Sequence, residues 1–213
     1  MHTPRIFVSM GTPYTETYAK FRDTLEDFLR SQCQCDPRII GKNEYPTGSP
    51  IGKIAEVMRG CDGVMIVAYE RKYVQAGVER RGGANETRLS GEIYTTAWNH
   101  IESAIAYSLG LPIYIIAQKG LKEEGLIESK TDWYVQKIDF TSESLRHPDV
   151  VGSIQAWIRE RVATRGKKRR AALEGFAFLK ISDFTMEDWA LLGALVGGSF
   201  GLGVAAAHWL HIA

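Results

Sequence analysis

The sequence predicts an α/β fold, with a parallel sheet of about five strands flanked by helices, followed by one C-terminal transmembrane helix. Three observations lead to this prediction. Short apolar runs alternate with stretches of helical periodicity, which is the order that produces a parallel sheet covered on both faces. Two of the runs, 63–68 and 113–117, are apolar along almost their whole length, as in strands buried on both faces. A last stretch, 189–210, contains no Asp, Glu, Lys or Arg.

The strands are expected where the apolar runs are short. The first is 6–9, after Pro4, and the next is a brief one at 38–40. The buried runs 63–68 and 113–117 follow, and 135–140 is the last strand. Such an alternation is typical of a flavodoxin-like sheet, in which ligands bind beyond the carboxyl ends of the strands. Those ends are 9–14, 68–73 and 117–120.

The helices are expected where apolar residues recur every three or four positions. Residues 18–29 place Phe21, Leu25, Phe28 and Leu29 at this spacing. Residues 51–58 form a second helix, with Ser49 as N-cap and Pro50 in its first turn. A third, 98–109, is ended by Gly110 and Pro112. A long basic helix is expected from 148 to 175. The polar stretch 70–96, which contains Gly82 and Gly83, is interpreted as a long loop.

Composition narrows the class of protein. The chain has 213 residues, a net charge of +1 and 24% charged residues, and this balance argues against a general nucleic-acid binder. The three cysteines, Cys33, Cys35 and Cys61, are an odd number without metal-like spacing, which indicates a reducing compartment. We expect no metal site, no cofactor and no secretory signal at the N-terminus.

The tail predicts a single-pass membrane anchor. About 20 apolar helical residues cross a bilayer core, and Trp189 and Trp209 lie near the two ends of the stretch, where indole rings favour the interface. Basic residues precede it: Arg159, Arg161, Arg165, Lys167, Lys168, Arg169, Arg170 and Lys180. Because positive charge stays on the cytoplasmic side, we expect the soluble domain to face the cytoplasm. The alternative is a glycine-rich helix buried in a soluble fold.

The tail also divides the chain. We expect a soluble domain at 1–165, a basic amphipathic connector at 166–187 and the anchor at 188–213. Gly193, Gly197 and Gly201 share one helix face, and small residues at this spacing let two membrane helices approach closely. A homo-oligomer is therefore expected, although glycine is also common in membrane spans that do not pair.

The residues most indicative of chemistry lie between Trp98 and Ile116. Glu102 is an acid in a helix whose other positions are largely apolar or small. Ile101, Ile105 and Leu109 are expected to pack on the sheet, with Glu102 beside them. A carboxylate near a helix N-terminus is favourable by about 0.3–1 kcal/mol, so a purely structural role at the helix end is one interpretation of Glu102.

A second interpretation comes from resemblance. The order of elements, the pattern W-x-x-I-E-x-A-x-A-x-x-L-G-x-P-I at 98–113 and the opening Phe7-Val-Ser-Met-Gly11 with Pro13-Tyr14 resemble the TIR-like and nucleoside 2-deoxyribosyltransferase-like superfamily. The resemblance covers roughly residues 5–160. It implies that Glu102 is the catalytic carboxylate, acting on the anomeric carbon of a nucleoside or of NAD. The second pocket acid of these families has no clear counterpart; Glu86 and Glu92 are the candidates.

The resemblance also implies where a ligand would bind. Tyr14, Tyr69 and Trp98 would stack on a base, while Ser9 and Asn99 would bond ribose hydroxyls and Gly11 would line the pocket. For each aromatic residue a packing role is the alternative. His100 does not share a helix face with Glu102, so we expect it at the surface or behind the site. Arg80-Arg81-Gly82-Gly83 is a phosphate clamp or simply a solvated loop, and 120–125 is a surface turn.

Three functions follow from these expectations. The first is a membrane-anchored enzyme, an NAD glycohydrolase or nucleoside N-glycosidase, with a role in anti-phage or stress defence by analogy with TIR-type systems. The second is a sensor that binds a nucleotide signal without cleaving it and whose tail oligomerises or disturbs the membrane. The third is a TIR-like adaptor. The expected partners are accordingly NAD or a nucleotide, a membrane through 189–210, and further copies of the chain.

Overall fold

The computed structural model describes residues 3–45, 48–128 and 133–168 of the chain. These residues belong to one compact unit, Met1–Lys168. Five parallel strands form its sheet in the order β2 (Asp36–Arg38), β1 (Arg5–Met10), β3 (Gly63–Ala68), β6 (Ile113–Gln118) and β7 (Tyr134–Ile138). The expected α/β sheet of five parallel strands is therefore present.

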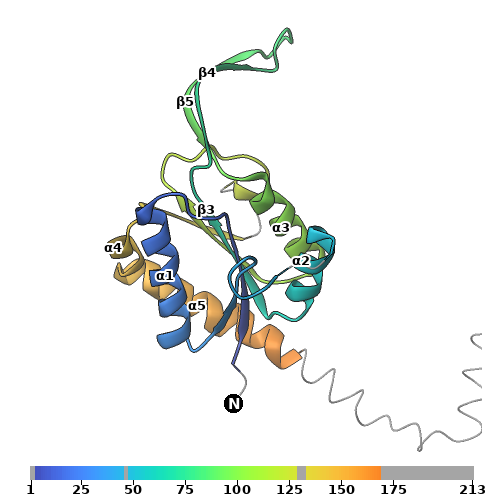
Figure 1. Cartoon of the computed structure of the whole chain (residues 1–213), viewed down its shortest axis with the longest axis vertical. Coiled ribbons are helices and arrows are strands. Elements are labelled where there is room, and N and C mark those ends of the chain that lie inside the picture. The colour runs from blue at the N-terminus through green and yellow to red at the C-terminus, as the bar shows by residue number, and fades with distance from the viewer. Residues whose placement is uncertain (1–2, 46–47, 129–132, 169–213) are drawn as a thin grey trace, which may run out of the picture. The chain divides into compact units, whose positions relative to one another are not determined.

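Helices cover both faces of this sheet (Figure 1). On one face lie α1 (Glu16–Ser31), α4 (Ser142–Leu145), α5 (Pro148–Trp157) and the π-helical turn η2 (Ile158–Val162). On the other lie α2 (Pro50–Arg59), α3 (Ala97–Ser108) and the short 3-10 turn η1 (Gly125–Ile127). The expected cap of α2 is confirmed, because the Ser49 hydroxyl accepts a hydrogen bond from the Gly52 amide and Pro50 opens the helix.

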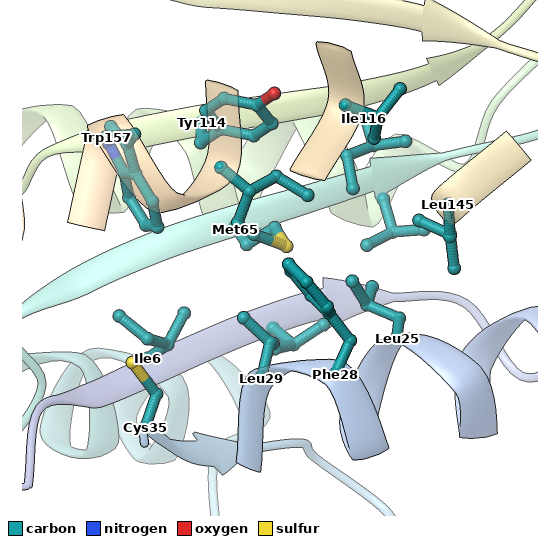
Figure 2. Packing of buried hydrophobic residues seen from close by; sticks show 14 of the residues in the cluster. Ile6, Leu25, Phe28, Leu29, Cys35, Met65, Tyr114, Ile116, Leu145 and Trp157 are labelled. Carbon is teal, nitrogen blue, oxygen red and sulfur yellow. The ribbon is translucent and has the colours of Figure 1, made fainter. Parts of the chain in front are cut away.

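The side chains of each strand alternate between two hydrophobic clusters. Ile6, Met65, Tyr114 and Ile116 point to the α1 side, where Leu25, Phe28 and Leu29 meet them (Figure 2). Their strand neighbours face α2 and α3 instead: Phe7, Val64, Ile66, Ile113 and Ile115. Every residue of β3 is buried, which explains why this strand is apolar without alternation.

The segment 70–96 is not the long loop that the sequence predicts. It contains an antiparallel hairpin of β4 (Lys72–Glu79) and β5 (Thr87–Tyr94), which projects away from the sheet (Figure 1). Most of its side chains are exposed, so neither strand carries the alternation of polar and apolar residues that indicates a strand resting on a core. The hairpin is an insertion between β3 and α3.

The fold class predicted from sequence requires a correction at its C-terminus. Among the described residues no helix is both long and apolar enough to cross a bilayer. The fold class of the described residues is therefore a five-stranded parallel α/β sheet with an inserted hairpin, and no transmembrane helix is among them. Residues 189–210, which prompted that expectation, lie outside the described residues, as do Gly193, Gly197 and Gly201 and most of the connector. The predicted basic helix from 148 is α5, which passes through η2 and stays helical to Lys168.

Candidate functional site

A cavity of about 330 Å³ opens at the carboxyl ends of the strands. The chain leaves β1 towards β2 on one side and returns to β3 on the other, so the strand order reverses between β1 and β3. A crevice at such a reversal is where open α/β sheets bind their ligands. The lining comes from segments after β1, β2 and β3, and from α2 and α3: Met10, Gly11, Thr12, Ile40, Pro50, Ile54, Arg71, Thr96, Trp98, Asn99 and Glu102.

Glu102 reaches this cavity from the buried face of α3. That face consists of Asn99, Glu102, Ser103 and Ala106, spaced as one side of a helix. The expected packing stripe holds for Ile105 and Leu109, which pack against the core, but not for Ile101, which is 37% exposed whereas Glu102 is only 8% exposed. Nor does Glu102 lie in the first turn of α3, which contains no acid. A structural role at the helix end therefore does not account for its burial.

The environment of Glu102 keeps its proton affinity high. Burial raises the pKa of Glu102 to about 7, and a hydrogen bond from the Ser9 hydroxyl opposes this rise. A carboxyl group with such a pKa holds appreciable amounts of both protonation states at neutral pH. It is therefore suited to accept or release a proton, or to act as a carboxylate beside developing positive charge.

Polar side chains buried behind Glu102 form a hydrogen-bonded chain. The Thr95 hydroxyl donates to Asn99 Oδ1 at 2.6 Å, and Asn99 Nδ2 donates to Ser9 Oγ at 2.9 Å. Ser9 is the next-to-last residue of β1, and Thr95 comes just before the N-cap of α3, Thr96. The chain thus joins the first strand to the helix that carries the acid.

The structure brings most of the predicted site residues together. Gly11, Trp98, Asn99 and Glu102 line the cavity, with Trp98 43% exposed and available for stacking, and Ser9 lies directly behind them.

The two predicted tyrosines are not among the lining residues. Tyr69 is buried in the core, and its hydroxyl donates to the Gly11 carbonyl at 2.7 Å, so it holds the loop after β1. Tyr14 donates to the Glu70 carbonyl at 2.9 Å.

Arg71 is the functional candidate that the sequence analysis missed. It lies in the short segment between β3 and β4 and lines the cavity from there. Its guanidinium carbon lies 5.8 Å from the centre of the Tyr14 ring. Among the described lining residues it is the only cation and Glu102 the only acid. Its position within 68–73, at a strand end, was the available clue, since charged residues there face the ligand crevice.

The other sequence candidates lie away from the cavity lining. Glu92 accepts a hydrogen bond from the Tyr94 hydroxyl and pairs with Lys122 at 2.9 Å, and Glu86 accepts from the Gly82 amide at the hairpin tip. Arg80–Gly83 form that same tip. The His100 Nε2 atom lies 3.8 Å from a Glu124 carboxylate oxygen. Neither Glu86 nor Glu92 therefore serves as a second pocket acid in this arrangement.

A larger cavity, of about 510 Å³, lies at the opposite end of the strands, beside the amino ends of β6 and β7. Its lining includes the aromatic side chains of Tyr107, Trp133 and Trp157. The carboxyl ends of the strands and the reversal of strand order are both elsewhere. We therefore assign the candidate site to the smaller cavity around Glu102.

The cysteines do not form a second site. Burial raises the pKa of the Cys33 thiol to about 11 and those of Cys35 and Cys61 to about 12. Thiols of this kind are poor nucleophiles, because the thiolate is the reactive form. The described part of the chain holds no group of His, Cys, Asp and Glu arranged to bind a metal ion.

Comparisons with known proteins leave the family open. No protein-family model matches the chain, and no curated protein matches it in sequence. A CMP N-glycosidase of Clostridium botulinum is similar in structure, with 14% identity and a TM-score of 0.43, over 72% of this chain and 98% of that one. A β-glucosidase of Erythrobacter marinus matches with 8% identity and a TM-score of 0.43, over 71% of this chain and 25% of that one. Both likenesses are too low to carry an inference about chemistry, which rests on the geometry of the cavity.

Proposed function

We propose that this chain is an N-glycosidase that hydrolyses the bond between sugar and base in a nucleoside or nucleotide, with Glu102 acting at the anomeric carbon. The observation that carries the proposal is a buried carboxyl group of near-neutral pKa opening into a cavity at the reversal of strand order. The resemblance of 98–113 to the nucleoside 2-deoxyribosyltransferase-like pattern supports the same role.

The chemistry fits the groups in the cavity. When the C1′–N bond breaks, its electron pair leaves with the base nitrogen and positive charge develops on C1′ and the ring oxygen. The Glu102 carboxylate stabilises this charge or forms an ester with C1′. Water then adds its oxygen to C1′, and its proton completes the leaving base. Trp98 offers an exposed ring on which the base can stack.

The single acid also restricts the mechanism. Hydrolysis by two carboxylates needs a general acid opposite the base, as in glycosidases that act on sugar–oxygen bonds. Among the described residues of the lining, Glu102 has no such companion. The proposal therefore assigns one carboxylate to C1′ and leaves the base to depart as a nitrogen anion or after protonation by solvent.

Product analysis by mass spectrometry tests this function. The full-length chain is incubated with nucleosides, nucleoside monophosphates including CMP, and NAD, in water enriched in ¹⁸O. We expect free base, and a sugar with ¹⁸O on C1′, for at least one substrate. Glu102→Gln should reduce the rate at least a thousandfold. The control is Ser103→Ala, which removes the neighbouring buried hydroxyl that donates to the Asn99 carbonyl. Turnover retained in Glu102→Gln contradicts the assignment.

A second candidate function is a nucleotide sensor. The absence of a second acid from the described lining favours it, because a protonated Glu102 can hold a ligand by donating a hydrogen bond. A sensor binds a member of the same panel saturably, and the ligand is recovered unchanged. The ¹⁸O experiment separates the two functions, since only hydrolysis labels the sugar.

A further inference from the structure

The buried polar chain behind Glu102 has one consistent direction of donation. Each hydroxyl has one proton to give, and the Asn99 amide has a donor end and an acceptor end. Thr95 Oγ1 donates to Asn99 Oδ1 at 2.6 Å, and Asn99 Nδ2 donates to Ser9 Oγ at 2.9 Å. The Ser9 hydroxyl in turn faces the Glu102 carboxylate, whose pKa it lowers. Thr95, Asn99 and Ser9 are between 1% and 8% exposed, so water does not compete for these bonds.

The backbone of β1 determines which way the Asn99 amide lies. Asn99 Nδ2 is also 3.4 Å from the carbonyl oxygen of Ser9. A carbonyl oxygen can only accept, so the amide atom that faces it must be the nitrogen. With the nitrogen held there, Ser9 Oγ receives a proton from Asn99 and its own proton remains for Glu102. The opposite orientation would set two oxygen atoms against each other and would take that proton towards Asn99.

We propose that Thr95, Asn99 and Ser9 are positioning residues that form a one-way hydrogen-bond relay, which keeps the only Ser9 proton directed at the Glu102 carboxylate. This inference rests on the proposed role of Glu102. The relay holds the carboxylate beside the cavity in a fixed rotamer, and it favours the ionised form, which is the form that can act at C1′. It also explains why the buried face of α3 carries Asn99 and why Thr95 precedes the cap.

The other described groups that line the cavity around Glu102 are mostly apolar, so we assign hydrogen-bond donation to its carboxylate to the relay. Within the cavity α2 contributes the apolar side chains of Pro50 and Ile54, and β1 contributes Met10. The only cation among the described lining residues is Arg71, which is exposed to solvent. Burial raises the pKa of Glu102, and the Ser9 hydroxyl lowers it.

The relay can be tested on Glu102 directly, without turnover. Full-length protein is labelled with glutamate carrying ¹³C at Cδ, and the Glu102 signal is identified by its loss in Glu102→Gln. Titration of this signal should give a midpoint of about 7 in the wild type. In Ser9→Ala the midpoint should rise by about one pH unit, because a hydrogen bond to the charged form is lost.

Variants of Thr95 give the decisive test, because Thr95 does not contact Glu102 in the proposed relay. We expect Thr95→Val, which removes the hydroxyl at constant size, to raise the midpoint by less than Ser9→Ala does. Thr95→Ser, which keeps the hydroxyl, should have the same midpoint as the wild type. Ser103→Ala should also leave the midpoint unchanged. In the Ser9→Ala background the effect of Thr95→Val should vanish, since the relay is already cut at its last step.

The outcomes separate the relay from the activity. The relay is overturned if Thr95→Val leaves the midpoint unchanged, or shifts it equally with and without Ser9. Should the midpoints follow the expected order while no substrate is cleaved, the relay stands and the proposed hydrolysis fails. Thermal unfolding followed by circular dichroism identifies any variant that has lost its fold.

Discussion

Glu102 combines two properties that oppose one another in most protein cores, since it is buried and yet ionises near neutral pH. Burial of a carboxylate is costly unless hydrogen bonds or charges compensate for it. Here a hydrogen bond from the Ser9 hydroxyl offsets part of that cost. The residue is thus poorly stabilised in its ionised form, which is the condition under which a ligand that develops positive charge gains most from it.

At the same scale, Arg71 predicts which ligands the cavity prefers. As the only described cation of the lining, it should pair with a phosphate group, to which a guanidinium binds in a bidentate way. We expect Arg71→Ala to weaken binding of nucleoside monophosphates about tenfold while binding of the matching nucleosides changes little. Isothermal titration calorimetry on the Glu102→Gln background measures both. Arg80→Ala, at the hairpin tip, is the matched control, and equal losses for nucleosides and nucleotides would contradict the prediction.

The sequence could predict part of this site. The motif at 98–113 identified Glu102, and the strand ends identified Gly11 and Ser9, because these positions follow from local pattern. Tyr14 and Tyr69 were assigned to the ligand, but their hydroxyls bond backbone carbonyls of the loops instead. A sequence does not show which way an aromatic ring turns at a strand end, nor that Thr95 and Ser9 meet through Asn99 across 90 residues of chain.

Among the elements, predictability followed burial. The strands β3 and β6 were apparent because both their faces are covered, and α1 was apparent because its apolar residues share one face. The hairpin of β4 and β5 was missed for the opposite reason. Its residues are paired with each other rather than packed on a core, so its pattern is that of a solvated loop. The buried face of α3 was misplaced because its polar residues, not Ile101, face the sheet.

The contact between β3 and η2 yields a prediction on stability. A Cβ atom added to Gly63 would lie 2.8 Å from Val162 Cγ2 and 3.1 Å from the Trp157 ring, both of which are buried. Gly63→Ala should therefore lower the free energy of unfolding by about 1–3 kcal/mol, as overpacking does. Gly152→Ala, in α5 with nothing within 4 Å of the added atom, should instead stabilise by about 0.5–1 kcal/mol.

Denaturant unfolding of both variants measures these effects. The mechanism of the Gly63 effect is checked by adding Val162→Ala, which makes room for the new methyl group. The double variant should lose less stability than the sum of the two single variants. Strict additivity would show that Gly63 is required for its backbone and not for the space beside Val162.

At the scale of the whole molecule, the site follows from topology. A chain that places β1 between β2 and β3 leaves a crevice where the order reverses, whichever side chains line it. The hairpin insertion begins at this crevice, since Arg71 precedes β4 and Thr96 follows β5, and both line the cavity. The alternation of elements predicted this sheet from sequence. The inserted hairpin, which places Arg71 at the cavity, could not be predicted, because it has no hydrophobic pattern of its own.

The same burial makes the stability of the whole molecule depend on pH through Glu102. The pKa of Glu102 is about 7 in the folded chain, whereas the ordinary pKa of a glutamate side chain is 4.5. Below about pH 4.5 both states hold the proton, and Glu102 has no effect on stability. Between the two values only the folded state holds it, so stability falls as pH rises, and the loss is complete above about pH 7.

Glu102→Gln should abolish this loss. Relative to the wild type, the variant should become more stable as the pH is raised from 5 to 8, by on the order of 3 kcal/mol, since one pKa unit corresponds to about 1.4 kcal/mol. Denaturant unfolding at several pH values measures the difference. Glu92→Gln is the control, because hydrogen bonds from Tyr94 and Lys122 lower the pKa of that half-buried acid, so its difference from the wild type should stay constant between pH 5 and 8. A pH-independent difference for Glu102→Gln would mean that Glu102 ionises normally. A rising difference, together with lost turnover, would show that the fold gives up stability to keep this acid in the cavity.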